Sequence, residues 1–538
     1  MASLDGLPAY HGAMSTPDTP LQADAAYRAL STRDARFDGR FFVGVTSTGI
    51  YCRPVCRVRV PRAENCRFFP HAAAAELGGF RPCLRCRPEL APGLSLTDTS
   101  RTLARTAASM IERAVADGLP VSLADLAGRL GVTDRHLRRI FAAEFDVSPI
   151  DWLTTHRLLL AKQLLTDTRL PVTQVALASG FGSLRRFNDA FASHYRLAPG
   201  ALRKAGEPRN AKSTPATAHE AGDVTLTLPW RAPYDVAAMR QFLANRPLPG
   251  VEAHADGVWR RTLRVPHLQT HLTGWISLTL DEARGAARVG VSASLAPALG
   301  AVRRRVRHLL DVDTDTTSID AALQNLPGGM RPGLRVPGCM DGFETTVRII
   351  LGQQVTVAAA CTLAGRLVRR FGEPVSTPHD GLTHFFPTAQ ALAEADPAHI
   401  GELGIVRTRV GALQALARAV SEDVLHLDRS EPMEQTLQTL QSLPGIGPWT
   451  CELVAMRVLG WPDAFPASDI GVINALGGLK PAASVPMAEA WRPWRSYAVL
   501  QLWQQLPVAA PKPPSASAPA RTAALTSPHL DTPPQANT

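Results

Sequence analysis

Five of the eight cysteines lie between positions 52 and 86, and four of them form two closely spaced pairs. Cys52 and Cys56 form a C-x3-C pair, Cys83 and Cys86 form a C-x2-C pair, and 26 residues separate the pairs. Each short spacing lets one turn direct two sulfur atoms toward one point, as a tetrahedral Zn²⁺ site requires. In a reducing compartment this crowding indicates a metal site rather than disulfides.

Arginine dominates the same stretch of chain. Eight arginines lie between Cys52 and Arg87, against only two acids, Glu64 and Glu76. Cations at this density attract phosphate groups. Spacing alone leaves two interpretations open: a zinc ion that only stabilises the module, and a zinc-bound thiolate that reacts with nucleic acid.

A second chemical signal is the string LPGIGPWTC, from Leu443 to Cys451. A Leu-Pro-Gly-x-Gly turn between two helices is typical of a helix-hairpin-helix, so Gly445, Ile446 and Gly447 are candidate DNA contacts. The glycines would let backbone amides approach a DNA phosphate without interference from a Cβ atom. Asp469 follows Trp449 by twenty residues. On spacing alone this carboxylate is either a helix N-cap or a catalytic group.

Two helix-turn-helix patterns precede the hairpin, over Val121–Pro149 and Val172–Pro199. In the first, Ser122 and Thr133 are predicted helix caps on either side of a turn at Gly131. In the second, a helix from Ser183 follows a turn at Gly180. The candidate DNA contacts on the two second helices are Arg135, Arg138, Arg139, Arg185 and Arg186. Such side chains can reach base edges and phosphates, and the alternative is a helical bundle with solvated arginines.

Composition sets the frame for these sites. At about 150 residues per domain, 538 residues predict three or four domains. A formal net charge of +10 fits a polyanionic partner. The sequence contains no run of about 18 apolar residues, so it predicts no transmembrane helix. Residues 1–20 lack the basic and apolar regions of a secretory signal and are expected to be a loose leader.

The pattern along the chain predicts a multidomain, mainly α protein. It comprises a small zinc-bound α+β module, a tandem helix-turn-helix, a mixed α/β subdomain and an all-α helix-hairpin-helix core. The expected divisions are 21–90 for the zinc module, 97–205 for the helix-turn-helix pair, 206–221 for a linker, 222–328 for the strand-containing subdomain, 329–506 for the helical core and 507–538 for a disordered tail. Polar, proline-bearing composition marks the linker and the tail.

The zinc module resembles the N-terminal domain of the bacterial adaptive-response (Ada) family. The resemblance rests on FVGVTSTGIYCRPVCR at 42–57, ENCRFF at 64–69 and GFRPCLRCRPE at 79–89. It implies that Cys52, Cys56, Cys83 and Cys86 bind Zn²⁺, and that Cys52 accepts a methyl group from DNA methylphosphotriesters. The two helix-turn-helix patterns resemble the DNA-binding domain of AraC-type regulators.

The C-terminal half resembles DNA-3-methyladenine glycosylase II of the helix-hairpin-helix superfamily. The matching strings are the hairpin, Asp469, RPGLRVPGCMDGFE at 331–344, ILGQQVTV at 350–357 and WRPWRSYAVLQLW at 491–503. The resemblance implies that Asp469 drives glycosidic cleavage and that Trp449 and Trp503 line the base pocket. Trp449 also stands where lyase-active relatives carry a lysine, which implies a monofunctional glycosylase.

Two positions depart from that family. Leu453 replaces a second pocket tyrosine of its best-known member, and Gln354 replaces the apolar side chain that fills the gap left by the flipped base. No Pro-Cys-His-Arg string occurs, so the O6-methylguanine acceptor domain of full-length Ada proteins is absent from this sequence.

Together these patterns predict a cytoplasmic, nucleoid-associated alkylation-repair protein that contains Zn²⁺. It would accept methyl groups on a zinc thiolate, bind promoter DNA and excise alkylated bases. Its expected partners are alkylated and promoter double-stranded DNA and RNA polymerase, without a membrane, and it is expected to be a monomer. The alternatives are a regulator whose glycosylase half only binds damaged DNA, and an enzyme whose cysteine module is a structural zinc ribbon.

Overall fold

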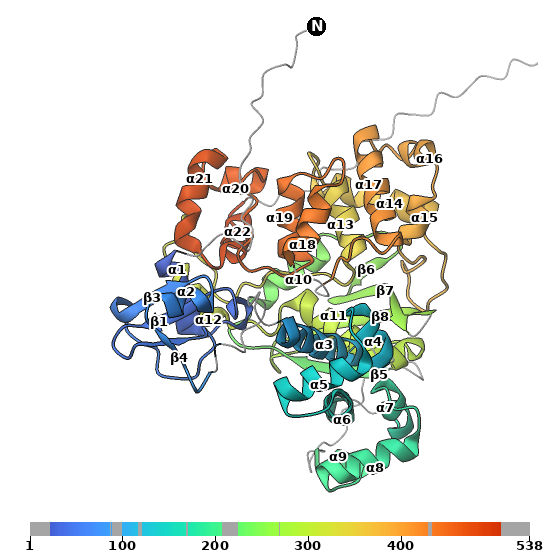
Figure 1. Ribbon diagram of the computed structural model, residues 1–538. Coiled ribbons are helices and arrows are strands. Elements are labelled where there is room, and N and C mark those ends of the chain that lie inside the picture. Colours follow the sequence, from blue (N-terminus) through green and yellow to red (C-terminus); the bar gives the residue numbers. More distant parts are fainter. Residues whose placement is uncertain are drawn as a thin grey trace, which may run out of the picture.

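The computed structural model describes residues 22–86, 88, 99–116, 121–167, 170–206, 224–267, 270–428 and 433–506 (Figure 1). The expected leader and tail lie outside these residues. So does the expected linker, except for Gly206, which ends a helix.

The zinc module is a small sheet with short helices on it. Its four strands run in the order β3-β1-β2-β4, with β2 and β4 parallel and the other pairs antiparallel. The elements are α1 (Ala23–Thr32), η1 (Ala35–Phe37), β1 (Phe42–Val45), β2 (Ile50–Cys52), η2 (Ala63–Asn65), β3 (Cys66–Phe69), α2 (Ala72–Leu77) and β4 (Arg81–Pro82). Its core is small, with Phe37, Phe41 and Val43 packed beside the cysteines.

The helix-turn-helix module contains only helices among its described residues. They are α3 (Thr99–Ala116), α4 (Leu123–Arg129), α5 (Asp134–Phe145), α6 (Pro149–Asp167), α7 (Val172–Ala178), α8 (Leu184–Tyr195) and α9 (Pro199–Gly206). Ser122 and Thr133 each cap the following helix by accepting a backbone N–H bond, which confirms the predicted caps, and Ser183 caps α8 in the same way. Gly131 and Gly180 take the left-handed conformation that the turns need.

A five-stranded antiparallel sheet follows, in the order β5-β9-β8-β7-β6. Its strands are β5 (Val224–Pro229), β6 (Glu252–Ala255), β7 (Val258–His267), β8 (Thr270–Asp281) and β9 (Ala286–Val291). The helices α10 (Val236–Ala244), η4 (Ala293–Ala298), α11 (Leu299–Leu310) and α12 (Thr316–Ala322) accompany it. In β5 the alternation of Val224, Leu226 and Leu228 with polar residues buries one face, as the period of two requires.

The last part is all helical among its described residues. Its elements are α13 (Gly342–Leu351), α14 (Val357–Phe371), α15 (Ala389–Ala393), α16 (Pro397–Gly401), α17 (Arg407–Ser421), α18 (Met433–Gln441), α19 (Pro448–Arg457), α20 (Ile470–Ala475), α21 (Pro481–Ala488), η5 (Glu489–Trp491) and α22 (Arg495–Gln504). The hairpin joins α18 to α19, and Asp469 immediately precedes α20.

Two features tie the parts together. The helix-turn-helix module shares one hydrophobic core with the five-stranded sheet. A buried ion network then joins that sheet to α13: Arg261 bonds Glu252 at 3.1 Å and Glu344 at 2.6 Å. Burial raises the pKa of Glu344, but the charges and hydrogen bonds of Arg261 and Arg348 together outweigh this effect and leave that pKa lowered.

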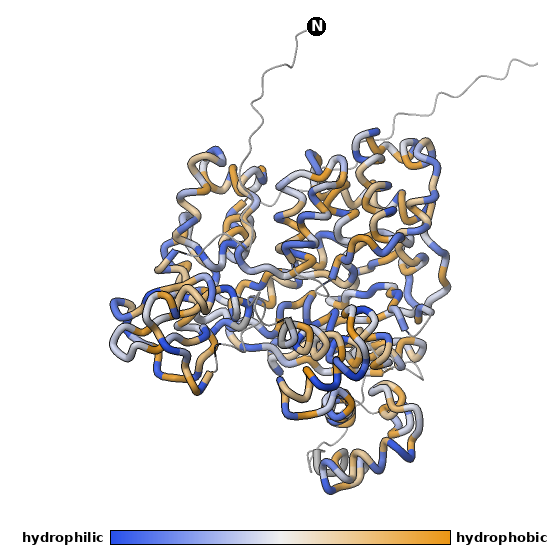
Figure 2. Tube along the Cα trace, viewed as in Figure 1, coloured by the Kyte–Doolittle hydropathy of each residue, from blue (hydrophilic) through white to orange (hydrophobic). Residues whose placement is uncertain are grey.

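Hydrophobic and hydrophilic residues interleave along the helices in Figure 2. No helix within the described ranges is both long and apolar enough to cross a membrane. The overall architecture confirms the expected fold class of a zinc module, a helix-turn-helix module, a strand-containing subdomain and a helix-hairpin-helix core.

Candidate zinc and base-excision sites

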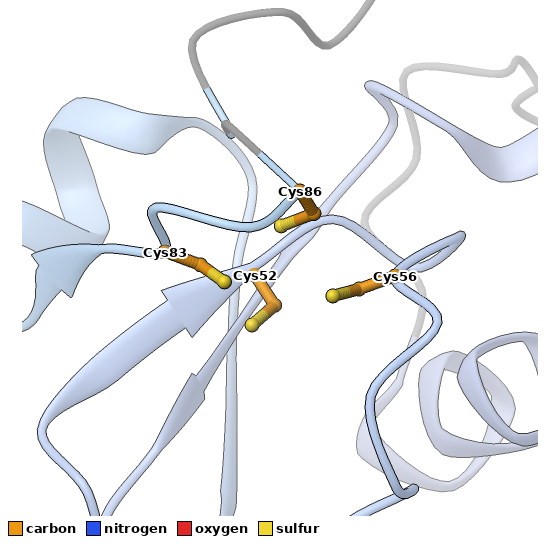
Figure 3. A group of neighbouring side chains, drawn as sticks. All are labelled: Cys52, Cys56, Cys83 and Cys86. Atoms are coloured by element: carbon orange, nitrogen blue, oxygen red, sulfur yellow. The ribbon is translucent and has the colours of Figure 1, made fainter.

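The four paired cysteines converge on one point (Figure 3), and their sulfur atoms all lie within 4.8 Å of one another. Strand pairing explains the convergence. Because Tyr51 pairs with Pro82 in parallel register, Cys52 and Cys83 leave adjacent strand ends side by side. A turn closed by a bond from the Cys56 amide to the Arg53 carbonyl, at 3.1 Å, then returns Cys56 to the cluster.

The donor set fits Zn²⁺. Four sulfurs bound at about 2.3 Å would lie about 3.8 Å apart in a tetrahedron, which is close to the observed spread. Without a cation each thiol disfavours ionisation of its neighbours. A hydrogen bond to Cys86, burial and the charge of neighbouring thiolates raise the pKa of Cys52. Desolvation raises the pKa of Cys56 to about 11. A divalent cation at the centre removes this conflict, because it favours all four thiolates.

Two backbone groups position the cluster. The Arg53 amide donates to the Cys86 sulfur at 3.4 Å, and the Cys83 amide donates to the Tyr51 carbonyl at 3.0 Å. Cys52, Cys56 and Cys83 are buried and Cys86 is half-buried. Exposure therefore does not single out Cys52 as the reactive sulfur.

The described arginines that follow Cys52 in this module fall into two groups. Arg53 pairs with Asp38 and supports the cluster from within the module. The exposed group consists of Arg57, Arg59, Arg62, Arg67, Arg81 and Arg85. These six side chains, here called the cationic face, are the ones for which the sequence predicts attraction to phosphate.

In the helical core, Asp469 lies between Trp449 and Trp503. The Trp449 indole donates to Asp469 Oδ2 at 3.0 Å, and the Trp503 indole donates to Oδ1 at 2.9 Å. Oδ1 also accepts the amides of Gly471 and Val472, at 2.9 and 3.1 Å, at the start of α20. Asp469 is therefore the helix N-cap, and its carboxylate is at the same time fixed between two aromatic rings.

A buried scaffold holds the segment 461–469, here called the aspartate loop. Asp463, which is 1% exposed, accepts from Arg495 Nε at 2.8 Å and from Arg492 Nη1 at 3.0 Å. Glu452 Oε2 accepts the Phe465 amide at 2.9 Å, and Ser496 Oγ accepts the Ala464 amide at 3.0 Å. These bonds fix the chain that delivers Asp469.

The hairpin and the loop carrying Gln354 lie against each other. Gln353 Nε2 donates to the Gly445 carbonyl and to Thr450 Oγ1, both at 3.1 Å. Gln354 is exposed and has a φ of +55°, a strained conformation for a non-glycine residue. Gly445 also has positive φ, at +78°, and a Cβ there would lie 2.9 Å from the Ala412 Cβ.

Two hairpin-region side chains face the interior. Ile446 is 6% exposed, so any DNA contact at this position is through its backbone. Leu453 is also buried, on the first turns of α19. Gly447, with φ −106° and no atom within 4 Å of an added Cβ, leaves its amide open to approach.

The five candidate arginines of the helix-turn-helix module all lie exposed on α5 and α8. Arg138 pairs with Asp134 at 3.0 Å, and Arg185 lies 4.0 Å from Asp189. Arg139 Nη2 lies 3.0 Å from His136 Nδ1. Arg135 and Arg186 are exposed on the same two helices. Such exposed pairs contribute little to stability, so these side chains can exchange partners for phosphates.

Sequence reasoning missed three positions that hold the excision site. Gly471 admits no Cβ, because one would lie 2.9 Å from both Asp469 Oδ1 and the Trp503 ring. Nothing in the sequence indicated that Gln353 bonds the hairpin, because it lies next to Gln354 in a matched string and has no motif of its own. Asp463 was hidden because its partners, Arg492 and Arg495, are about thirty residues away in the chain.

Four family models match the chain. They are the metal binding domain of Ada at residues 25–89, a helix-turn-helix domain at 126–205, the AlkA N-terminal domain at 225–341, and the HhH-GPD superfamily base excision DNA repair protein at 347–494.

Curated relatives cover the same parts. The chain is 41% identical over 495 residues to the "Probable bifunctional transcriptional activator/DNA repair enzyme AlkA" of Mycobacterium tuberculosis, covering 90% of this chain and 96% of that protein. It is 39% identical over 279 residues to "DNA-3-methyladenine glycosylase 2" of Escherichia coli, covering 52% of this chain and 96% of that protein. It is 33% identical over 163 residues to "Bifunctional transcriptional activator/DNA repair enzyme Ada" of Escherichia coli, covering 30% of this chain and 44% of that protein.

Proposed function

Since the chain belongs to the family of bifunctional transcriptional activators and DNA repair enzymes that join an Ada-type zinc domain to a glycosylase, we propose that it couples three steps of alkylation repair. The general activities are those of the family: repair by a glycosylase, transcriptional activation, and binding of Zn²⁺ and DNA. The three specific steps that we propose are methyl acceptance at Cys52, binding to promoter DNA, and excision of 3-methyladenine and related bases.

The excision step rests on one observation: four N–H donors, two of them indoles, hold the Asp469 carboxylate. A carboxylate fixed in this way needs no reorganisation when positive charge develops on the sugar. An alkylated, cationic purine is already a good leaving group, so stabilising the sugar cation is the main task. The C–N bond breaks and its electron pair leaves with the cationic base, which departs neutral. Water then adds its oxygen to the sugar cation and loses a proton to solvent.

Trp449 and Trp503 support this step in two ways. Their N–H edges are engaged by Asp469, so a flipped base would contact the ring faces. Gly445 and Gly447 would bring hairpin amides to a phosphate, and Gln354 would stand at the gap left by the base.

The methyl-transfer step is proposed for Cys52, which matches the acceptor of the Ada family. Bound zinc holds the sulfur as a thiolate at neutral pH. An S–C bond forms as the methyl C–O bond breaks, and the departing phosphotriester becomes a phosphodiester anion. The product thioether has no easy route back, so each molecule would react once.

Regulation follows from charge. Four thiolates around Zn²⁺ carry a net charge of −2, and methylation of Cys52 reduces it to −1. The loss of one negative charge would weaken the repulsion between the zinc site and the DNA phosphates by about 1 kcal/mol at close range. Tighter binding would bring the arginines of α5 and α8 to promoter DNA, where RNA polymerase is the proposed partner.

The remaining assignments belong to the same proposal. They are a monomer in the bacterial cytoplasm, associated with the nucleoid, and the domain divisions 21–90, 97–205, 222–328 and 329–506. The ranges matched by the four family models support these divisions.

The decisive experiment measures release of free base from methylated duplex DNA under single-turnover conditions, with the full chain and with Asp469→Asn. The variant should lose ~10²-fold or more in rate, because the carboxylate charge is removed. Its DNA affinity should change little, because phosphate contacts supply most of it. Equal rates per folded molecule would reject Asp469 as catalytic. Absence of base release by the unmodified chain would favour the alternative, a regulator whose glycosylase half only binds damage.

A further inference from the structure

The zinc module lies directly against the last helices of the glycosylase core, with α1 beside α22 (Figure 1). The contact is made by a corner of the module, here called the docking corner: Arg28, Asp34, Arg36, Phe37 and Arg40. Arg28 Nε donates to the Arg492 carbonyl at 2.8 Å, and the Trp494 indole donates to Asp34 Oδ2 at 3.2 Å.

Further contacts from the corner reach Trp461, the first residue of the aspartate loop. The rings of Phe37 and Trp461 lie 5.7 Å apart, and the Arg40 guanidinium lies 5.3 Å from the Trp461 ring centre. Trp461 packs against the same small hydrophobic cluster that contains Cys52 and Cys56. Arg40 also pairs with Glu434, on α18 before the hairpin.

We propose that the docked zinc module is a positioning element of the excision site, which fixes the aspartate loop and thereby Asp469. The inference rests on the proposed role of Asp469 and goes beyond it, because it gives the zinc module a second task inside the glycosylase.

The path from the corner to Asp469 runs from half-buried residues to a buried ion cluster. Arg28 holds the backbone of Arg492, whose side chain bonds Asp463 at 3.0 Å. Asp463 lies within the aspartate loop and is also held by Arg495. Phe37 and Arg40 meet the first residue of the loop directly through Trp461. The route through Arg492 and Asp463 and the route through Trp461 therefore both restrain the segment that ends at Asp469.

The corner is also tied to the cysteine cluster. Arg33 Nε donates to the Cys56 carbonyl at 3.1 Å, and Arg33 Nη2 donates to the Val58 carbonyl at 2.9 Å. The next residue, Asp34, bonds Trp494. The cysteine loop is thus hydrogen-bonded to Arg33, the residue that ends α1 beside the docking corner.

Docking leaves the other face of the module open. The cationic face is formed by exposed arginines of the cysteine loops, β3 and β4, whereas the contacts with the glycosylase core described above are made by residues of the docking corner. The module can therefore support the glycosylase and still present its arginines to DNA.

The test compares the full chain with Arg28→Ala and with Phe37→Leu, and uses Arg284→Ala as the control. Arg284 is 72% exposed in the β8–β9 turn, where it pairs with Asp281 at 3.6 Å, and its replacement removes the same charge. Amide hydrogen exchange is followed in two places, the aspartate loop and the β7–β8 hairpin of the sheet. Local opening of the loop should accelerate its exchange by about tenfold in both corner variants, with β7–β8 unchanged.

Single-turnover base release supplies the second readout. Loosening of Asp469 should lower the rate constant several-fold, while the amplitude and the affinity for DNA stay the same. A variant that merely misfolds would instead lower the amplitude at an unchanged rate constant, which would contradict a positioning role.

The outcomes separate this inference from the proposed function. Unchanged exchange in the aspartate loop of both variants overturns the inference, whatever the activity. Faster loop exchange with an unchanged rate constant also overturns it, because the loop would then not position Asp469. Absence of base release in the unmodified chain refutes the glycosylase assignment, and loop exchange alone then decides whether the module restrains the loop.

Discussion

At the scale of the residue, Asp469 combines two roles that the sequence presented as alternatives. It caps α20 through Oδ1 and holds both indoles through its two oxygens. The cap keeps the carboxylate at the end of a helix, where the helix dipole favours its negative charge. A structural role and a proposed catalytic role therefore need the same atoms.

Replacing Trp503 by Phe tests the hydrogen bond apart from the ring. The bond from the indole to Oδ1 disappears, while a flat ring stays beside the site. We expect base release to slow by about tenfold, as for loss of one hydrogen bond to a charged group worth about 1.5 kcal/mol. Single-turnover kinetics measure the effect, with Trp230→Phe in the strand-containing subdomain as the control. An unchanged rate constant in Trp503→Phe would show that the bond does not support the reaction.

At the scale of the element, the hairpin shows how two glycines in one motif can have different tasks. Gly445 has positive φ and is crowded by Ala412, whereas Gly447 has negative φ and open space where a Cβ would stand. The first is needed to make the turn, and the second is free to meet a ligand.

This difference predicts opposite outcomes for two alanine substitutions. Gly445→Ala should lower the melting temperature, because a Cβ strains the turn. Gly447→Ala should leave melting unchanged and weaken DNA binding, because the new methyl group obstructs a phosphate at the amide. Thermal melting and binding to abasic duplex DNA measure the two effects. Full DNA affinity in Gly447→Ala would argue against a phosphate at that amide.

The zinc knuckles are the second element-scale case. The module has a small core, so the metal supplies much of its stability. Purified protein should contain one Zn²⁺, and the Cys83→Ser, Cys86→Ser double variant should lose it and lose helical order in α1. Elemental analysis and hydrogen exchange report on this, with Cys66→Ser as the control outside the cluster. Full zinc retention in the double variant would refute the ligand assignment.

Methyl acceptance is tested on the same knuckles by mass spectrometry. Incubation with methylphosphotriester DNA should add one methyl mass to the peptide that contains Cys52, once per molecule. A label on Cys56 or Cys66 would refute the proposed acceptor. A methylated protein with unchanged DNA affinity would retain the repair step and refute the charge switch.

At the scale of the whole molecule, docking joins residues that lie more than 450 positions apart, such as Asp34 and Trp494. Burial raises the pKa of Asp34, but the charge and hydrogen bonds of Arg36 and the bond from Trp494 outweigh it, so its pKa is lowered. The folded protein therefore favours the carboxylate form of Asp34, mainly through Arg36 of the same module and also through Trp494 of the glycosylase core.

A lowered pKa in the folded state fixes the direction of the pH effect. The stabilising contribution of Asp34 is fully present above its unfolded pKa of about 3.9 and is lost as the pH falls through the folded value. Asp34→Asn should therefore melt earlier than the unmodified chain at pH 7, and the difference should shrink on acidification below about pH 4. Melting curves across this range measure it. A difference that is constant with pH would show that the Asp34 charge does not stabilise the folded chain.

Much of the chemistry was determined by the sequence itself, because it depends on short spacings. The cysteine pairs, the capped helices after Ser122, Thr133 and Ser183, and the glycine-bearing turns are each made by residues a few positions apart. Local backbone geometry decides whether such residues can meet, so the spacing alone predicts the metal ligands, the caps and the turns.

The tertiary structure alone decided how these pieces support one another. The bonds from Trp449 and Trp503 to Asp469 span 20 and 34 positions, and the bond from Arg28 to the Arg492 carbonyl spans 464. Family resemblance could assign Trp449, Trp503 and Asp469 to one pocket, but periodicity and short spacing record none of these bonds, because each forms only when distant segments pack together. The sequence could place Asp469 beside a hairpin, but only packing between distant segments fixed its carboxylate and set the zinc module against the loop that carries it.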